Sequence, residues 1–508
     1  MSNIASNKKL ATNTLLLYFR MVFLMLVTLY TSRVTLEVLG VEDFGIYNIV
    51  SGVVVLFSFL SRSLNSACNR YFSIAVATDD VNEIQKNFST ALVAHFYLMV
   101  IVVIILESVG LWFINEKLNV PYERSQAVSI IYQIAVLSVC FNIIRTPYNA
   151  SIIAHENMGF YAYTSLVEGI LKLLIAWLLL IVSADHLIVY SLLMALIILA
   201  INIWYLIYCN SKFKGNRFVF KSDTTKMKEM LTFSGWNLFA GIADLGWQQG
   251  TNMILNVFYG VTLNAAMGIT NQVRNAVFSF VANLQTASNP QIIKSYSLAD
   301  YNRFYTLIYA ISKYSFYLML LFTIPLLLNI DYVMDLWLKN VPEYAISFTS
   351  LILVFSLFDT LIGPLWMANQ ANGDVKKYSI IVSCILLLNL PATYVLFYFK
   401  CVPESMLYAR IVILLLSILF QVFYTRLKVS LSLGRYFKEV IIPITLVTVI
   451  SFSITYVSSF LLNGFMKLIV SSLVSSIVLF ISIYAIGIGS KERQTVNAYL
   501  IKIIHKLR

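Results

Sequence analysis

Charged side chains are scarce in this sequence. They make up 12% of its 508 residues, against 59% for hydrophobic residues. Soluble domains are about 45–50% apolar and about 25% charged, so a water-soluble fold could not bury this much apolar surface. The composition excludes a soluble enzyme or binding module and predicts an integral membrane protein.

Cysteines, histidines and long polar loops are also few. The five cysteines have no paired or metal-type spacing and the four histidines are scattered, so we expect no metal site and no cofactor. The longest outer loop, near residues 331–343, leaves no room for a soluble domain. A membrane enzyme such as a glycan polymerase or ligase usually carries its catalytic side chains on a sizeable loop, so we expect no enzyme.

Apolar runs long enough to span a bilayer, roughly 20 residues each, fill most of the chain. They predict an all-α integral membrane protein with about fourteen transmembrane helices, although short breaks near the C-terminal end leave twelve or thirteen open. The first run lacks a small-residue cleavage site, so we expect a spanning helix and not a signal peptide. The expected spans are residues 10–36, 44–74, 85–114, 126–150, 160–183, 187–209, 229–257, 262–290, 304–329, 345–370, 377–399, 404–425, 437–461 and 464–488.

An internal repeat organises these helices. Residues 40–99 align without a gap on residues 260–319, with thirteen of sixty positions identical, beginning with Gly40 and Gly260. An even number of helices separates the copies, so both enter the membrane from the same side. Such parallel repeats, related by a pseudo-two-fold axis along the membrane normal, are typical of transporters built from two bundles.

Lysine and arginine are unevenly distributed among the loops. With both termini in the cytoplasm, twenty-two lie in or beside inner segments and five in outer ones, in agreement with the positive-inside rule. The net charge of +12 therefore indicates how the chain is oriented in the membrane and an attraction to anionic lipid head groups. It does not indicate binding to nucleic acid. The predicted parts are an N-terminal six-helix lobe (1–209), a basic cytoplasmic linker (210–228), a C-terminal six-helix lobe (229–427), two additional transmembrane helices (428–488) and a basic cytoplasmic tail (489–508).

Five cations lie well inside expected spans. A charge there costs at least about 2.5–3.5 kcal/mol unless it faces a wet cavity or a partner, and the repeat partners of all five are uncharged. Arginine also matches phosphate through its planar fork. We interpret the set as a cationic substrate-binding cavity, with interhelical pairs to Asp244 or Asp359 as the alternative. The five are Arg20, Arg62, Arg145, Arg274 and Lys313.

Amides are frequent in the spans expected at 229–257 and 262–290. They include Gln248, Asn271 and Asn275, our candidates for the polar lining of the cavity. Lipid-facing helices cannot carry so many amides cheaply. Either the amides pack against one another or they line a hydrophilic passage.

Acidic residues inside spans are fewer. Asp244, Asp359 and Glu168 are candidates for coupling transport to Na⁺ or H⁺, because a desolvated carboxylate takes up a proton or binds a cation. Glu168 also precedes Lys172 by four residues, which predicts an intrahelical ion pair as the alternative.

Prolines lie at corresponding places in the two halves. Pro147 and Pro364 fall in matching expected helices, and matched breaks can mark hinges or binding regions in transporters. Kinks tolerated by packing are the alternative.

Three local stretches complete the pattern: Leu39-Gly-Val-Glu-Asp-Phe-Gly-Ile-Tyr47, Ile153-Ala-His-Glu-Asn-Met-Gly-Phe-Tyr161 and Ala371-Asn-Gly-Asp-Val-Lys-Lys-Tyr378. With the helix count and the repeat, they make nearly the whole chain resemble the multidrug/oligosaccharidyl-lipid/polysaccharide exporter superfamily, and more narrowly bacterial O-antigen (Wzx-type) and capsule-type oligosaccharide flippases. The resemblance implies two six-helix lobes forming a V, alternating access and a polyprenyl-diphosphate-linked oligosaccharide as cargo. Related lipid II flippases hold the diphosphate with cavity arginines, and Arg20, Arg62 and Arg274 lie in broadly similar places.

These features predict a flippase of the bacterial inner membrane that carries a lipid-linked oligosaccharide to the periplasmic leaflet for O-antigen, capsule or other surface polysaccharide. We expect membrane lipid, the lipid-linked glycan and other polysaccharide-assembly proteins as partners, and a monomer. A cation-coupled multidrug exporter of the same fold is the alternative, although nine intramembrane cations against four acids do not suit its usual cationic cargo. A lipid II flippase differs from the leading interpretation only in cargo.

Overall fold

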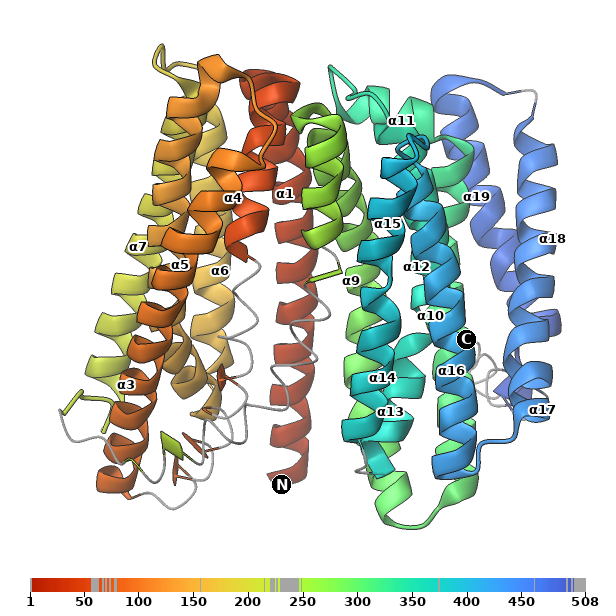
Figure 1. Cartoon of the computed structure of the whole chain (residues 1–508). Helices are drawn as coiled ribbons and strands as arrows, with labels where there is room; N and C mark the ends of the chain where they lie inside the picture. Colours follow the sequence, from red (N-terminus) through yellow and green to blue (C-terminus); the bar gives the residue numbers. More distant parts are fainter. Residues whose placement is uncertain are drawn as a thin grey trace. The chain divides into compact units, whose positions relative to one another are not determined.

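The computed structural model is helical, without strands, throughout the part of the chain that it describes (Figure 1). That part comprises residues 2–55, 64–65, 68, 71–72, 75–76, 80–155, 157–213, 215–219, 224, 227–228, 246–247, 249–372, 375–460, 462–489, 492–494 and 497, without the side chains of residues 2–21, 55, 158, 162, 287, 290, 294, 297 and 375. Within it, eleven helices are long and apolar enough to cross a membrane. The prediction of an all-α, multi-pass membrane protein is confirmed.

These eleven helices overlap with twelve of the fourteen expected spans, because the helix Val22–Val54 continues from the span expected at 10–36 into the one expected at 44–74. Of the other two, the span expected at 229–257 lies largely outside the described residues. The span expected at 262–290 forms a helix, α9 (Val261–Ser297), whose many amides lower its hydropathy. The count of fourteen therefore stays a prediction.

The chain divides into two compact units. Unit 1 comprises Met1–Ile269, Leu338–Glu343 and Thr393–Pro403. In unit 1, α1 packs against α5, α6 and α7, and α5 packs against α3 and α7. The bounds are α1 (Ser2–Val55), α3 (Val81–Ile105), η1 (Leu106–Gly110), α4 (Leu111–Glu116), η2 (Tyr122–Arg124), α5 (Ser125–Ala154), α6 (Met158–Leu179) and α7 (His186–Lys212).

Arg124 ties three of these elements together at one end of unit 1. Its Nε donates to Asp43 Oδ1 of α1 at 2.8 Å, and its Nη1 donates to Asp185 Oδ2 at 2.6 Å. Asp185 caps α7 by accepting from the backbone N–H groups of Leu187 and Ile188. Burial raises the pKa of Asp185, but the Ile188 N–H and Arg124 outweigh it and hold that pKa below its usual range.

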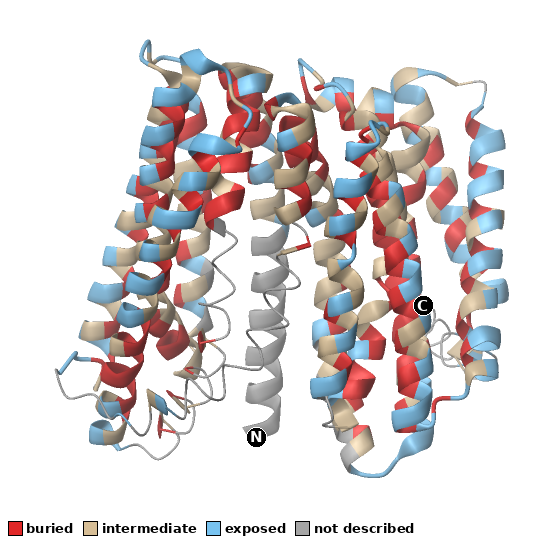
Figure 2. Ribbon diagram, viewed as in Figure 1, coloured by how far each residue is buried: buried red, intermediate tan, exposed pale blue. Residues whose placement is uncertain are grey.

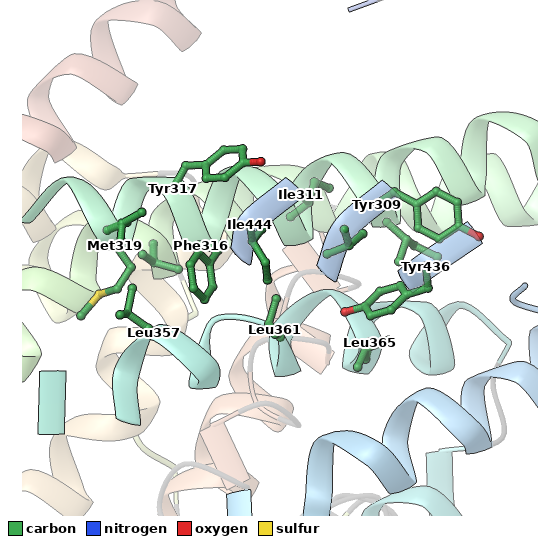
Figure 3. Packing of buried hydrophobic residues seen from close by; sticks show 14 of the residues in the cluster. Tyr309, Ile311, Phe316, Tyr317, Met319, Leu357, Leu361, Leu365, Tyr436 and Ile444 are labelled. Atoms are coloured by element: carbon green, nitrogen blue, oxygen red, sulfur yellow. The ribbon is translucent and has the colours of Figure 1, made fainter. Parts of the chain in front are cut away.

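Unit 2 comprises Thr270–Trp337, Tyr344–Ala392 and Glu404–Arg508. Here α10 packs against α12, α13, α18 and α19, while α16 packs against α12, α13 and α14. The bounds are α10 (Tyr301–Leu328), α11 (Ile330–Trp337), α12 (Ala345–Asp359), α13 (Ile362–Asn372), α14 (Val375–Leu387), α15 (Asn389–Tyr398), α16 (Ser405–Val429), α17 (Leu433–Tyr436), η3 (Phe437–Ile441), α18 (Ile442–Ser459), α19 (Gly464–Ser482) and η4 (Ile483–Gly487). Figure 3 shows apolar side chains such as Phe316, Leu361 and Ile444 packed between these helices.

The last two long helices show how side chains are sorted between protein and lipid. On α19 the buried residues include Ser471 and Ser475, whereas Leu473 and Ile477 are 59% and 57% exposed. Figure 2 shows exposed residues along much of α18 and α19. Small residues let membrane helices approach closely, and large apolar ones are at no disadvantage against lipid tails. Small polar residues facing the protein and large apolar residues facing outward are the pattern expected of lipid-facing helices.

The repeat is visible in the backbone. Gly40, which divides α1 at a kink, has φ 75°, and its counterpart Gly260, just before α9, has φ 79°; glycine adopts such positive angles without strain. Asp80 and Asp300, forty residues further along each copy, both cap the next helix, α3 and α10. The two copies thus share a turn and a cap. The predicted lobe boundaries stay a prediction.

Candidate functional site

A polar cavity of about 390 Å³ lies among the helices of unit 1. Most of its lining comes from α5 and α6, with contributions from α1 and α7. The lining residues are Leu24, Thr28, Asn65, Asn142, Arg145, Thr146, Asn149, Tyr161, Thr164, Ser165, Glu168, Gly169, Lys172, Ile201 and Tyr205.

The cavity is polar because α5 and α6 each carry a polar stripe with helical spacing. On α5 the stripe is Asn142, Arg145, Thr146 and Asn149, at positions i, i+3, i+4 and i+7, which share one face of a helix. On α6 the lining residues between Tyr161 and Lys172 follow the same spacing. Facing each other, the stripes keep polar groups away from lipid.

Arg145, a predicted substrate-binding residue, projects into this cavity. Its guanidinium carbon lies 5.6 Å from the centroid of the Tyr205 ring, a distance at which the cation is attracted to the ring face. Tyr205 is buried and its hydroxyl lies 3.3 Å from Thr164 Oγ1. No carboxylate among the described residues forms an ion pair with Arg145, so its in-plane N–H groups remain available for an anion.

Glu168, a predicted ion-coupling residue, lines the same cavity. Its Oε1 lies 2.7 Å from Lys172 Nζ, as the spacing of four residues predicts. The described lining residues therefore carry one paired acid, one paired base and Arg145, a net charge of +1.

Buried amides and a neighbouring cavity extend this polar region. Asn65 Oδ1 and Asn149 Oδ1 are buried and accept no hydrogen bond from the described residues. Asn142 also lines a second cavity of about 180 Å³, largely apolar, between α1, α5 and α7. Buried polar atoms rarely stay unsatisfied, so the larger cavity is suited to water or a polar ligand.

In unit 2, Arg274 is joined to Asp359, which we predicted as an ion-coupling residue. Arg274 Nη2 on α9 donates to Asp359 Oδ2 at 2.7 Å, with side chains 13% and 18% exposed. The guanidinium carbon lies 5.1 Å from the Phe278 ring, and Phe355 is contacted by both Arg274 and Arg410. The interhelical pair that the sequence left as an alternative is formed here.

Lys313 is also paired. Its Nζ lies 3.0 Å from Glu492 Oε2, in the segment after the last long helix, and its side chain is 7% exposed. Sequence reasoning assigned Glu492 to a cytoplasmic tail and so did not identify it as a partner. The substrate-binding roles of Arg274 and Lys313 stay predictions.

The amides of the spans expected at 229–257 and 262–290 fall into two groups. Some are buried and packed against one another, and others are partly or fully exposed. Asn264 Nδ2 donates to Asn252 Oδ1 at 3.1 Å, and Asn256 Nδ2 donates to Asn264 Oδ1 at 2.9 Å, so these buried amides pack against one another. Asn271 is half-buried and Asn275 is exposed. Their role as a polar lining stays a prediction.

The two candidate hinge prolines have different surroundings. Helix α5 runs through Pro147 from Ser125 to Ala154. Near Pro364 the helix is divided, because α12 ends at Asp359 and α13 begins at Ile362. Gln285 of α9 donates to the carbonyl oxygen of Thr360 in this break at 2.9 Å, which satisfies a carbonyl that the helix leaves free. Their role as hinges stays a prediction.

Four predicted site residues lie outside the described side chains. Arg62, Asp244 and Gln248 are not described, and Arg20 lies in α1 without a described side chain. Among the functional candidates that sequence reasoning missed are Asn142, Asn149 and Tyr205. The heptad-like spacing of the two asparagines around Arg145 is the signal that could have identified them.

No family model matches this sequence, and no curated protein matches it. Solved structures are nevertheless similar in fold. Lipid II flippase MurJ in an inward closed conformation matches with a TM-score of 0.71 at 12% identity, over 93% of this chain and 98% of that chain. An inward-facing multidrug resistance MATE family transporter of the MOP superfamily matches with a TM-score of 0.66 at 12% identity, over 80% and 94%. A MOP superfamily transporter from Pyrococcus furiosus matches with a TM-score of 0.60 at 13% identity, over 82% and 95%. At these identities the likeness shows the fold, which is that of the MATE and MurJ transporters.

Proposed function

We propose that this protein is a flippase of the multidrug/oligosaccharidyl-lipid/polysaccharide exporter superfamily. Its cargo would be a polyprenyl-diphosphate-linked oligosaccharide, carried from the cytoplasmic to the periplasmic leaflet of a bacterial inner membrane. The cavity of unit 1 is the observation that carries this proposal. Polar groups inside a membrane-spanning bundle are expensive and usually mark a substrate pathway, and the described residues that line this cavity have a net positive charge.

The lining of the cavity suits a phosphorylated or acidic glycan. Arg145 is held by the Tyr205 ring and can offer two parallel N–H groups to a phosphate or carboxylate. Asn142, Asn149 and Thr146 supply both donors and acceptors for sugar hydroxyls. A volume of about 390 Å³ lies at the lower end of ligand pockets, so the cavity would hold part of the cargo. Transport makes and breaks no covalent bond.

Arg274 and Asp359 supply a route for coupling. In the structure each neutralises the other at 2.7 Å. A proton or Na⁺ on Asp359 would free Arg274 to bind an anionic group of the cargo, and release of the ion would restore the pair. This exchange would link the occupancy of the ion site to that of the substrate site.

Two other transporters of this fold are the alternatives. The similarity to MATE family transporters supports a multidrug exporter. The usual cargo of such an exporter is cationic, however, and a cavity of net positive charge repels it. The similarity to MurJ extends over 93% of this chain, against 80% for the MATE transporter. It supports a lipid-linked cargo, and lipid II is one candidate.

Deletion of the gene, followed by assay of the lipid-linked glycan in each leaflet, tests the proposal. We expect glycan to accumulate on the cytoplasmic leaflet and surface glycan to disappear. Intact surface glycan with raised sensitivity to cationic drugs would instead establish the exporter, and accumulation of lipid II would establish a cell-wall flippase.

Complementation then tests the cavity itself. Arg145→Gln should lower surface glycan about tenfold or more at equal expression, because a charge-assisted hydrogen bond contributes about 1.5–3 kcal/mol. Arg303→Gln is the matched control, since Arg303 is exposed and donates to Gln291 Oε1 at 3.0 Å outside the cavity. Equal complementation by the two variants would contradict the assignment of Arg145.

A further inference from the structure

The second cavity of unit 1, which we call the apolar cavity, differs in chemistry from the polar cavity that contains Arg145. Its volume is about 180 Å³, and eight of its thirteen lining residues are aliphatic residues or methionine. Ser138 and Ser191 also line it, and their hydroxyls donate to carbonyl oxygens of their own helices at 2.8 Å and 2.9 Å. These two hydroxyls are therefore already bonded, and an occupant would meet mainly carbon atoms.

The two cavities follow one face of α5. The residues of this face line the apolar cavity from Ile131 to Asn142 and the polar cavity from Asn142 to Asn149. Their spacing of three and four residues keeps them on one side of the helix. Asn142 lines both cavities, so the cavities adjoin at this residue. Arg145 lies seven residues after Ser138, which is about 10 Å of helix.

The size of the apolar cavity indicates what it can hold. Protein interiors are densely packed, and the atoms that line a cavity lack dispersion contacts on one side until it is filled. In another protein, an engineered apolar cavity of about 150 Å³ stays dry and binds benzene, a molecule of six carbons. The apolar cavity is slightly larger. Part of its wall is braced, because the ring of Tyr47, which lines it, packs edge to face on Tyr190 at 4.8 Å.

We propose that the apolar cavity binds the aliphatic part of an amphiphilic anion whose charged group lies at Arg145. This inference rests on the proposed function and adds to it a site for the apolar part of the same cargo. The N–H groups of Arg145 would hold a phosphate, and an aliphatic group joined to it would extend past Asn142 into the apolar cavity. Two sources have this chemistry: the chain of a lipid carrier and an apolar substituent of a sugar, such as a methyl or acetyl group.

Binding of alkyl phosphates to the full-length protein in phosphatidylcholine nanodiscs tests the site. Methyl, propyl and octyl phosphate share one charged group and differ only in their carbon chain. Ser138→Leu fills part of the apolar cavity. Ser129→Leu is the matched control, because Ser129 is exposed on the same helix and, like Ser138, donates to the carbonyl oxygen four residues earlier. Titration calorimetry measures the Kd of each probe for each variant.

We expect Ser138→Leu to bind octyl phosphate about tenfold more weakly than Ser129→Leu does, and methyl phosphate equally well. Each methylene that is kept out of an apolar site weakens binding about fourfold, so exclusion of two suffices for this loss. Partition of a probe into the nanodisc lipid is the same for both variants and cancels in the comparison.

Two results would overturn the proposal: equal binding of octyl phosphate by the two variants, or an equal loss of methyl phosphate in Ser138→Leu, which would show a general distortion. Ala135→Leu fills the same cavity and replaces Ser138→Leu if that variant fails to fold. A loss that is already complete with propyl phosphate would identify a small substituent of a sugar as the occupant. A loss seen only with octyl phosphate would identify the chain of a lipid carrier.

Arg145→Gln separates this inference from the proposed function. It should weaken methyl and octyl phosphate by the same factor, because both probes have the same charged group. If it weakens neither, the charged group does not lie at Arg145 and the proposal is overturned. If deletion of the gene leaves surface glycan intact while the variants give the expected pattern, the assignment of the cargo fails and the site for an amphiphilic anion stands.

Discussion

Arg145 and Arg274 are residues of one type in different surroundings. Arg145 lies against the Tyr205 ring and faces a cavity. Arg274 is paired with Asp359, the last residue of α12. A carboxylate at the C-terminal end of a helix faces the negative end of the helix dipole, so Asp359 gains from a nearby cation. Arg274 therefore stabilises the fold whatever the cargo is, whereas Arg145 has no such partner among the described residues.

A double-mutant cycle tests this difference. We expect Arg274→Gln and Asp359→Asn each to lower the free energy of unfolding by about 1–3 kcal/mol, because each leaves a largely buried partner without its hydrogen bond. The double variant should cost less than the sum of the two. Thermal unfolding in detergent measures all three. Additive losses would show that the two side chains do not interact.

At the scale of elements, close helix contacts depend on glycine. A Cβ placed on Gly45 of α1 would collide with the carbonyl oxygen of Val261, at the start of α9. Similarly, a Cβ on Gly268 would lie 2.7 Å from the side chain of Asn48. Positions 48 and 268 are equivalent in the repeat, so the two copies meet within unit 1 through corresponding residues, and glycine provides the space.

Gly45→Ala should therefore destabilise the protein by about 1–3 kcal/mol, the usual cost of overpacking, since the obstacle is backbone and cannot rotate away. Gly159→Ala in α6 is the matched control, because no described atom outside its own helix backbone and chain neighbours lies within 4 Å of its Cβ position. The control should be neutral or stabilising by up to about 1 kcal/mol. Melting temperatures of the two variants in detergent measure the effect, and equal values would refute the close contact.

On the scale of the whole molecule, the uneven distribution of lysine and arginine predicts orientation. Twenty-two lie in or beside the segments expected inside and five in those expected outside. Translocating basic loops is unfavourable, so both termini should remain in the cytoplasm.

Reporter fusions to the C-terminus test this orientation. Green fluorescent protein should fluoresce there, whereas alkaline phosphatase, which needs the periplasm to form its disulfides, should be inactive. The opposite pattern, at equal expression of both fusions, would place the tail outside and reverse the assignment of every loop.

Features that depend on local pattern and on the bilayer were determined by the sequence alone. Apolar runs of span length require helices, because no other open backbone structure satisfies its hydrogen bonds in lipid. The repeat aligned Gly40 with Gly260, and both have positive φ. The pair of Glu168 and Lys172 followed from its spacing on one helix.

Pairings between helices were decided only by the tertiary structure. Arg274 and Asp359 are 85 residues apart, and Lys313 and Glu492 are 179 residues apart. Which side chains meet depends on how each helix is rotated about its axis and on which helices are its neighbours. In a bundle whose helices are apolar on most faces, the hydropathy of the sequence does not determine the rotation or the neighbours. The sequence thus placed five cations inside the membrane, and the packing of the helices determined that Arg145 faces a cavity while Arg274 and Lys313 each face a carboxylate.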